Sequence, residues 1–400
     1  MTQEHVSATP QELIGQDGTG SRGDGAVGGR RGAVRDRPRV LHVCEAFDGG
    51  VATAVHTVTD TTQGVDHTVL LVPRPARMGL GWSTVKRPGV AYLDTDGGTS
   101  MLGAMRRIAH VYRELDPDIV HAHSSFAGVY VRCLPMIPRS KIVYSPHCLA
   151  FERTDVGRGR RAVFRGVEWA LARRTGTFAA CNEREAGLAR AMRRGLNVVD
   201  LSHVPQVPEE YVQRARPPEP GEPPLVVGVG RLCVQKDPGY FAEVVRIANE
   251  IGVSARWLWI GGGDDDMQRE LEEQGVEVTG WMPRQAALDA MSASHVFLHT
   301  ASWEAQALSV LEAAAIGLPV VARDVPAMSG APVGQWVSSP AGAAEAVAQL
   351  SSAERWHEIA RRSRDVLRAS LETTDIPGAI VAAYSLDRRY VGDAPAVPAV

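Results

Sequence analysis

Two carboxylates and two cations in the second half of this 400-residue chain could together hold a phosphorylated ligand that carries hydroxyl groups. Glu304 and Glu312 lie in TASWEAQALSVLEAAAIGLPVVA, where apolar residues recur at the three- and four-residue spacing of a helix with one buried face. A buried carboxylate is costly unless donors meet it, so hydroxyl or N–H groups are expected opposite the pair. Arg231 and Lys236 could bind a diphosphate, because arginine can contact two of its oxygens at once.

The elements that must position these four residues are predicted to alternate between buried strands and helices. Residues 295–300 (HVFLHT) and 319–322 (PVVA) are apolar runs of strand length, and the helix between them is expected to end near Gly317. Residues 225–230 (LVVGVG) form another strand, followed by a helix that Asp237 would cap. Ligands of parallel sheets bind at the carboxyl ends of the strands, where Arg231, Lys236 and Glu304 would lie, with Glu312 two turns further on in the helix.

The first half of the chain shows the same alternation and indicates a parallel doubly wound sheet. Strand 40–44 leads to Gly49 and Gly50, where backbone N–H groups at a helix N-terminus could approach an anion. A tight turn without a ligand would also explain the two glycines. Two later strands end in His123 and His147, which fit a ligand site and a purely structural role equally well.

Several of these segments resemble the motifs of glycosyltransferase family 4. WEAQALSVLEAAAIGLPVVA carries the E-x7-E pattern and is similar to the family's EGLPLVLLEAMACGKPVVA, while GRL-x3-KD is similar to its GRL-x3-KG. DIVHAH and SPHCL are similar to its histidine segments. The resemblance extends over about residues 39–390 and is strongest in 225–322. It implies an α/β protein of the GT-B fold, with two Rossmann-like doubly wound parallel-sheet domains facing a central cleft, and a retaining glycosyltransferase that uses a nucleotide-sugar donor.

The same resemblance assigns roles to individual residues. Arg231 and Lys236 would neutralise the donor pyrophosphate, Glu304 would orient the donor sugar, and Glu312 would hold the ribose. His147 would face the sugar near the reacting centre. The remaining residues expected at the site are His123 on the acceptor side and, around the donor, Gly49, Gly50, Gly261, Trp281, Met282, Ala307 and Leu308.

The chain departs from the family pattern at Gln306, which replaces an apolar residue after the first glutamate and leaves the sugar specificity open. The resemblance implies a UDP- or GDP-type sugar as co-substrate, no cofactor and no metal. The run Asp264 to Asp266 suggests a D-x-D metal site, but acidic residues that open a helix interact favourably with its dipole without an ion. We therefore predict no metal site there.

Composition and charge exclude several other classes of protein. The net charge of −3 argues against a nucleic-acid-binding surface over the whole molecule. Five scattered cysteines without a CxxC pair suggest reduced thiols. No apolar run approaches the roughly 18 residues of a membrane span, and no signal-peptide segment is evident. We expect a cytoplasmic protein.

Domain boundaries are predicted from composition. The glycine-rich residues 1–36 would be a disordered tail, and 37–205 an N-terminal acceptor domain. The proline-rich residues 206–224 would be a linker, and 225–375 a C-terminal donor domain. The end of the chain, about 376–395, would pack back on the N-terminal domain, as in GT-B proteins.

Residues 157–174 predict a basic helix with an apolar stripe formed by Val163, Phe164, Val167, Ala170 and Leu171. Such a helix could lie on an anionic membrane at the inner face, where family members find lipid acceptors, or it could face the core and leave its arginines in solvent. The acceptor itself, whether a glycan, a lipid or a small metabolite, is left open.

Two other functions explain parts of the sequence. A non-catalytic GT-B protein could bind a nucleotide or stabilise another transferase, although it would have no need for the two cations and two glutamates together. A dinucleotide-dependent oxidoreductase is disfavoured, because Cys233 stands where the third glycine of the GVGRLC segment should be and the expected acid further on is missing.

Overall fold

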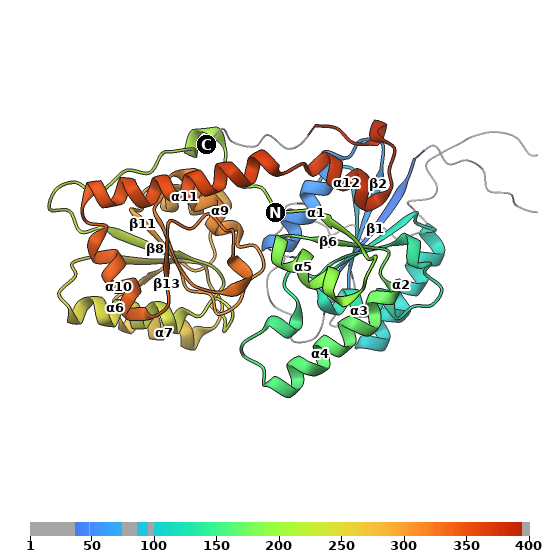
Figure 1. Ribbon diagram of the computed structural model, residues 1–400, viewed down its shortest axis with the longest axis horizontal. Coiled ribbons are helices and arrows are strands. Elements are labelled where there is room, and N and C mark those ends of the chain that lie inside the picture. The colour runs from blue at the N-terminus through green and yellow to red at the C-terminus, as the bar shows by residue number, and fades with distance from the viewer. Residues whose placement is uncertain (1–36, 48, 74–85, 95–99, 394–400) are drawn as a thin grey trace, which may run out of the picture.

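Two parallel sheets organise the chain in a computed structural model, which describes residues 37–47, 49–73, 86–94 and 100–393 (Figure 1). The predicted tail, residues 1–36, lies outside the described residues. Each sheet is covered by helices on both faces, so its central strands are buried on both sides and consist of apolar residues and histidines. The prediction of two doubly wound parallel-sheet units is confirmed.

Within the described residues, the first sheet has seven strands in the order β3-β2-β1-β4-β5-β6-β7, and all its pairs are parallel. The order reverses between β1 and β4, which places the first expected ligand-binding crevice beyond the ends of these two strands. The strands are β1 (Arg39–Cys44), β2 (Asp66–Leu71), β3 (Val90–Leu93), β4 (Ile119–His123), β5 (Ile142–Ser145), β6 (Thr177–Ala180) and β7 (Asn197–Asp200).

In the described part of the second unit, the sheet has six parallel strands in the order β10-β9-β8-β11-β12-β13. Its order reverses between β8 and β11, so a second crevice is expected there. The strands are β8 (Leu225–Val229), β9 (Arg256–Ile260), β10 (Glu277–Val278), β11 (Val296–His299), β12 (Val320–Arg323) and β13 (Gln335–Val337).

Side-chain caps define the starts of several helices, as at Ser100, Asn182 and Asp237, each of which accepts a bond from a backbone N–H in the first turn. The helix that begins at Ser125 ends at Arg132, because Pro135 cannot continue it. The helices are α1 (Gly49–Thr61), α2 (Met101–Leu115), α3 (Ser125–Arg132), α4 (Arg158–Leu171), α5 (Glu183–Met192), α6 (Pro238–Glu250), α7 (Asp265–Glu273), α8 (Arg284–Ser292), α9 (Leu308–Ile316), α10 (Pro340–Gln349), α11 (Ala353–Thr373) and α12 (Ile376–Tyr384).

The chain passes twice between the two units. α11 covers the second sheet and leads into α12, which packs against β6, β7 and α1 of the first unit (Figure 1). The segment 206–224, predicted as a linker, lies against α9: Tyr211 is buried, and the N–H groups of Gln213 and Ala215 donate to carbonyls at the end of that helix. Apolar side chains within this proline-rich stretch explain why it packs. Among the described residues, no helix combines the length and apolar character needed to cross a bilayer.

Candidate active site between the two units

The ends of β8 and β11 bring one of the predicted cations to one of the predicted acids. The Lys236 ammonium pairs with Oε1 of Glu304, and the two side chains are 20% and 8% exposed. The loops that carry them are joined, because the Thr300 hydroxyl donates to the Lys236 carbonyl over 2.8 Å and the Ser302 N–H donates to the Gln235 carbonyl over 2.9 Å. The ion pair therefore has a fixed place at the carboxyl edge of the second sheet.

Glu304 is held as a carboxylate. Burial alone would raise its pKa, but Lys236, His299 and the Ala305 N–H together lower the pKa of this carboxyl. His299 Nε2 lies 3.9 Å from Glu304 Oε1, and burial lowers the pKa of this histidine to about 3. The sequence interpretation did not include His299. His299 lies at the end of β11, and a histidine at a strand end is the same sequence signal that led to the prediction of His123 and His147.

Arg231 follows Gly230 directly, at the end of β8, and is half-buried. It thus lies at the same edge of the sheet as Lys236, where the sequence predicts the diphosphate. Two cations at this edge could stabilise negative charge on a leaving phosphate.

Glu312 lies on α9 and has a partner that the sequence interpretation missed. Arg284, the first residue of α8, donates to Glu312 Oε1 over 2.7 Å and also donates to the Gln206 carbonyl. Burial raises the pKa of Glu312, and Arg284 offsets part of that rise. Because Arg284 is 28 residues earlier in the chain, no local spacing could indicate the pair. The predicted contact of Glu312 with a ribose stays a prediction.

The glycine-rich turn after β9 is explained first by packing. Gly261 has φ +130°, and a Cβ added there would lie 2.2 Å from the Gly230 carbonyl oxygen, so only glycine allows the turns after β8 and β9 to approach this closely. Trp281 is 68% exposed beside Gly262, and Met282 next to it is half-buried. Contacts of these residues with a nucleotide stay predictions.

The first aspartate of the acidic run has a structural role. Asp264 caps α7, because its Oδ1 accepts bonds from the N–H groups of Asp266 and Met267 at 3.0 and 3.1 Å. Asp265 and Asp266 follow in the first turn, where negative charge suits the helix dipole.

Two predicted donor-binding segments meet across the units. α1 begins at Gly49, which has φ +45°, and a Cβ added at Gly50 would lie 3.9 Å from the Leu308 side chain at the start of α9. Ala307, the residue before α9, is buried. The glycine turn of the first sheet therefore faces the helix that carries Glu312.

His147 lies beyond β5 in an unusual backbone conformation. His147 and Cys148 have φ values of +49° and +99°, which are uncommon for residues with side chains. The buried Glu185 carboxylate holds this turn, because it accepts from the N–H groups of Cys148 and Cys181 at 2.9 and 3.1 Å. His123 is 1% exposed, and its Nδ1 lies 3.1 Å from His147 Nε2. His123 is therefore behind His147, and its place on the acceptor side stays a prediction.

Gln306 joins the two units. Its Oε1 accepts from the His203 N–H over 2.6 Å, and Asn182 Nδ2 donates to the Ala305 carbonyl over 3.0 Å. The His203 ring stacks on that of His147 with centroids 5.8 Å apart. The residue that departs from the family pattern thus has a specific role, since an apolar side chain could not make this bond.

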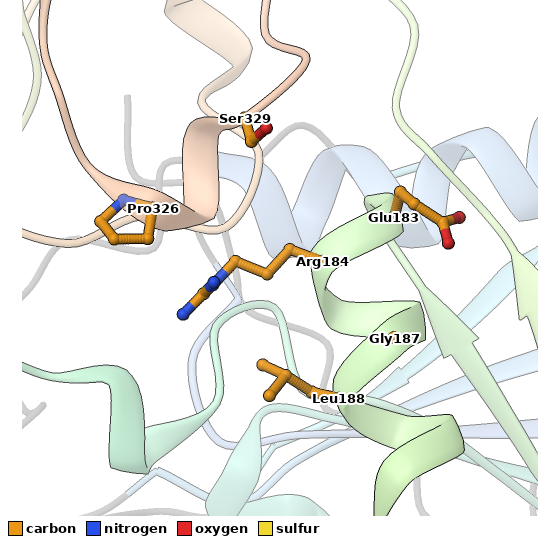
Figure 2. Close-up of a pocket in the computed structure, with 6 residues that line it drawn as sticks. All are labelled: Glu183, Arg184, Gly187, Leu188, Pro326 and Ser329. Carbon is orange, nitrogen blue, oxygen red and sulfur yellow. The ribbon is translucent and has the colours of Figure 1, made fainter.

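A pocket of about 420 Å³ opens beside these contacts, between α5 and the turn at Pro326–Met328 (Figure 2). Figure 2 shows Arg184 and Leu188 reaching from α5 toward Pro326, whereas Glu183 points away. Arg184 also pairs with Glu152 over 2.7 Å. The two units therefore leave a cavity between them at this part of their interface.

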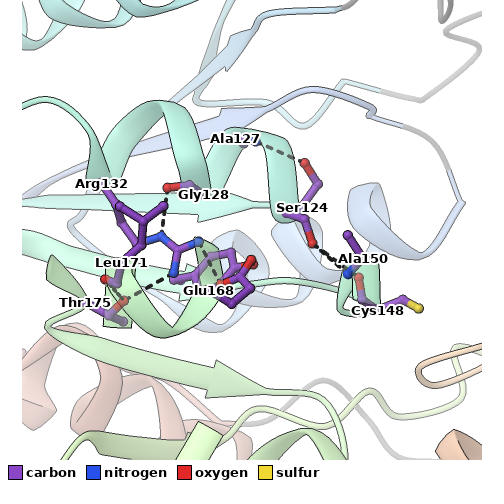
Figure 3. A network of polar contacts seen from close by, with 11 residues as sticks. Ser124, Ala127, Gly128, Arg132, Cys148, Ala150, Glu168, Leu171 and Thr175 are labelled. Carbon is purple, nitrogen blue, oxygen red and sulfur yellow. Dashed lines mark hydrogen bonds and ion pairs between the residues drawn. The ribbon is translucent and has the colours of Figure 1, made fainter. Parts of the chain in front are cut away.

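α4 is fixed to the first unit by a buried ion pair (Figure 3). Arg132 and Glu168 are 3.0 Å apart, the guanidinium lies 3.9 Å above the Tyr144 ring, and the Tyr144 hydroxyl donates to Glu168 over 2.9 Å. The apolar stripe predicted for this helix is only partly covered: Phe164 and Leu171 are half-buried, while the other three residues are exposed. The alternative of a core-facing stripe is therefore wrong for Val163, Val167 and Ala170, because the acid Glu168 takes the buried position.

Comparisons with known proteins agree with this arrangement. Residues 48–199 match the family described as "Glycosyltransferase Family 4", and residues 223–353 match the one described as "Glycosyl transferases group 1". A GDP-mannose-dependent alpha-mannosyltransferase of Mycolicibacterium smegmatis is 27% identical over 309 residues, which cover 72% of this chain and 80% of that protein. A UDP-Gal:alpha-D-GlcNAc-diphosphoundecaprenol alpha-1,3-galactosyltransferase of Escherichia coli is 25% identical over 249 residues, covering 56% and 63%. The structure of Anabaena HepE in complex with UDP and glucose has a TM-score of 0.63 at 14% identity, covering 86% of this chain and 97% of that one.

Proposed function

The chain belongs to the family 4-type glycosyltransferases with the GT-B fold, and from that premise we propose that it transfers a hexose from a UDP- or GDP-sugar to a hydroxyl acceptor with retention of anomeric configuration. The relatives named for UDP-galactose and GDP-mannose substrates support these donors. The observation that carries the proposal is the Lys236–Glu304 pair at the end of β8 and β11, opposite the glycine turn of the first unit.

In the proposed reaction, each part of this pair has a separate task. Lys236, with Arg231, stabilises the charge that grows on the leaving diphosphate, an electrostatic role that needs neither a metal nor a covalent intermediate. Glu304, an ionised carboxylate, accepts hydrogen bonds from hydroxyls of the donor sugar and so orients it. Retention then follows because the acceptor hydroxyl attacks the sugar on the face that the diphosphate leaves. The bond between the sugar and the diphosphate breaks as the new bond forms, and an oxygen of the leaving phosphate takes the hydroxyl proton.

Nucleotide binding tests the placement of the diphosphate. We expect one of UDP, GDP, ADP and dTDP to raise the melting temperature of the protein, since a ligand at a hundred times its dissociation constant adds about 2.7 kcal/mol of stability. Arg231→Ala should weaken the binding of that nucleotide by about 10- to 100-fold, which is the contribution of one or two charged hydrogen bonds. Arg256→Ala is the matched control, because Arg256 begins β9 at the opposite edge of the same sheet. Equal affinity in both variants would place the diphosphate elsewhere.

We propose a lipid-linked glycan as the acceptor and α4 as the contact with the membrane that holds it. The Escherichia coli relative is named for a diphosphoundecaprenol-linked acceptor. α4 exposes Val163 and Trp169 by 62% and 55% and carries exposed arginines at 158, 160 and 165. An exposed apolar and basic helix can bury its apolar side chains at an anionic membrane surface.

Vesicle binding tests this contact. The protein should co-sediment with vesicles of phosphatidylglycerol and phosphatidylcholine at low salt. The double variant Arg158→Glu/Arg160→Glu should bind at least about 30-fold more weakly, since the two lost arginines alone contribute about 1 kcal/mol each and the added glutamates are repelled by the anionic surface. Arg269→Glu/Arg362→Glu makes the same charge change on α7 and α11 of the second unit and should bind like the wild type. Wild-type protein that stays in the supernatant would end this part of the proposal.

A further inference from the structure

Four histidines form a continuous row of ring contacts across adjacent strands of the first sheet. His67 Nδ1 lies 3.0 Å from His42 Nε2, and His42 Nδ1 lies 3.1 Å from His123 Nε2. The row continues from His123 Nδ1 to His147 Nε2 over 3.1 Å. β2, β1, β4 and β5 are neighbours in the sheet, so the row follows the strand order and ends at the proposed active site.

These rings are neutral near pH 7. Burial lowers the pKa of His67 to about 4 and lowers the pKa values of His42, His123 and His147 well below 6.5. A neutral imidazole donates from one nitrogen and accepts at the other. In an unbroken row of such rings, the direction of one hydrogen bond therefore fixes the direction of all the others.

Thr62 fixes that direction at the outer end of the row. Its hydroxyl oxygen lies 2.7 Å from His67 Nε2 and 2.9 Å from the Val58 carbonyl oxygen. The hydroxyl has one hydrogen, and a carbonyl can only accept, so the bond to Val58 uses that hydrogen. His67 Nε2 must then carry the proton and donate to Thr62. By the same reasoning each of the four rings carries its proton on Nε2.

The inner end of the row is the Nδ1 atom of His147, which this direction leaves without a proton. The atom is buried and has no hydrogen-bond partner among the described residues. Leaving a buried acceptor without a donor is costly, so a ligand hydroxyl is a favourable partner. The stacked His203 ring, whose backbone N–H binds Gln306, connects this end of the row to the Glu304 loop.

A metal ion is a weaker explanation of the cluster. His42, His121 and His123 place nitrogen atoms within 4.8 Å of one another, a group that could hold an ion. However, both nitrogens of His121 already have partners, the Tyr384 hydroxyl at 2.7 Å and the Ser145 hydroxyl at 2.9 Å. The nitrogens of His42 and His123 are engaged within the row. An ion would have to break these bonds, because each ligand must turn a lone pair toward the metal.

We propose that Thr62, acting through His67, His42 and His123, sets the tautomer of His147, so that His147 presents an unprotonated Nδ1 that accepts a hydrogen bond from a substrate hydroxyl. Thr62 and the first three histidines are positioning residues in this arrangement, and His147 contacts the substrate. The identity of the substrate, a nucleotide sugar or its acceptor, rests on the proposed function, whereas the tautomer does not.

Nitrogen NMR of the full chain with ring-¹⁵N-labelled histidine, without ligand, tests the tautomer directly. We expect the signals of His42, His67, His123 and His147 to show a protonated Nε2 and a bare Nδ1, with assignments made from single His→Gln variants. In Thr62→Val the hydroxyl that fixes the direction is lost, and either direction of the row then leaves one N–H and one lone pair unpaired at its two ends. Neither direction is favoured any longer, so a fraction of the molecules should show a protonated Nδ1 on His147. Thr62→Ser keeps the hydroxyl and should keep the wild-type signals.

A protonated Nδ1 on His147 in the wild type, or an unchanged His147 signal in Thr62→Val, would overturn the proposal. Turnover of UDP- and GDP-hexoses provides the functional measurement. Thr62→Val should lower kcat in proportion to the fraction of molecules with a reversed row, up to about tenfold for complete reversal, the effect of one hydrogen bond, with the nucleotide dissociation constant unchanged and Thr62→Ser close to the wild type. An unchanged kcat in a variant with a reversed row would disprove the contact with the substrate hydroxyl. If the wild type shows the expected tautomers but turns over no nucleotide sugar, the proposed function fails while the assignment of the row stands.

Discussion

Replacing Lys236 with alanine is expected to lower the turnover of a UDP- or GDP-hexose by about 10²–10³-fold, as when one group that stabilises developing charge is removed from an active site. Lys236 is 20% exposed and lies at the carboxyl end of β8, where the leaving diphosphate is proposed to bind. The measurement is the rate of nucleotide release from UDP-glucose, UDP-galactose and GDP-mannose, with saturating donor so that the change in kcat is seen.

The ion pair complicates this experiment, because the same change leaves the buried Glu304 carboxylate without its partner. Breaking a buried pair costs about 3–5 kcal/mol, which could unfold part of the protein and mimic a catalytic defect. The double variant Lys236→Ala/Glu304→Gln removes both charges and should recover most of the stability in urea unfolding. It should not recover the rate, since Arg231 is then the only one of the two proposed cations beside the diphosphate.

A matched control shows whether the expected loss of turnover depends on the position of the lysine or occurs whenever a lysine is removed. Lys141 is also partly exposed and near an acid, with its Nζ 3.8 Å from Asp116, but it precedes β5 at the opposite edge of the first sheet. Lys141→Ala should leave turnover within about twofold of the wild type, as expected for a surface pair. Wild-type turnover in Lys236→Ala, or a double variant that regains the rate with its stability, would contradict the proposed role of this lysine.

The sequence could predict the positions of those candidate site residues that come directly after a strand. Buried apolar runs identify the strands, and the residues that follow them must lie at the carboxyl edge of their sheet: Lys236 and Glu304 in the second sheet, and His147 in the first. The fold could be predicted for the same reason, because strands and helices alternate at regular intervals. The ends of helices are harder to predict from sequence. The end of α3 at Arg132, shortly before Pro135, shows how a single proline decides the boundary.

The contacts that the sequence could not predict join residues far apart in the chain. Arg284 meets Glu312 because α8 and α9 pack together, and Glu168 of α4 meets Arg132 of α3 although they are 36 residues apart in the chain. The histidine row is the clearest case. His42 and His67 are isolated apolar-strand residues in the sequence, and they become neighbours only once the strand order β2-β1-β4-β5 is known. Local patterns carry no information about that order.

The buried histidines lead to a second large effect, a loss of stability in mild acid. Burial lowers the pKa of His67 and His203 to about 4 and that of His121 to about 3, from 6.5. Between pH 6.5 and these values the unfolded chain binds more protons than the folded one, so the free energy of unfolding falls as the pH falls. At pH 5 each ring should lower it by about 2 kcal/mol, and the three together by about 6 kcal/mol, a large share of the 5–15 kcal/mol typical of a folded domain.

Urea unfolding at intervals from pH 7 to pH 5 measures this effect, because the slope against pH gives the number of protons taken up on unfolding. His203→Asn should lower that number by about one. The pKa values of the buried Glu185 and Glu312 are raised from 4.5, so these groups act in the opposite direction above pH 4.5 and reduce the slope, whereas the lowered pKa of Glu304 acts with the histidines below pH 4.5.

A stability that stays constant from pH 6.5 to pH 5 would show that these rings bind protons as easily in the folded protein as in the unfolded chain. The consequence would reach beyond acid stability. Protonated rings donate from both nitrogens, and two facing donors cannot share a hydrogen bond, so a row of charged histidines could not hold His147 in one tautomer. The pH dependence of unfolding therefore tests, without any substrate, the neutrality on which the order of the histidine row depends.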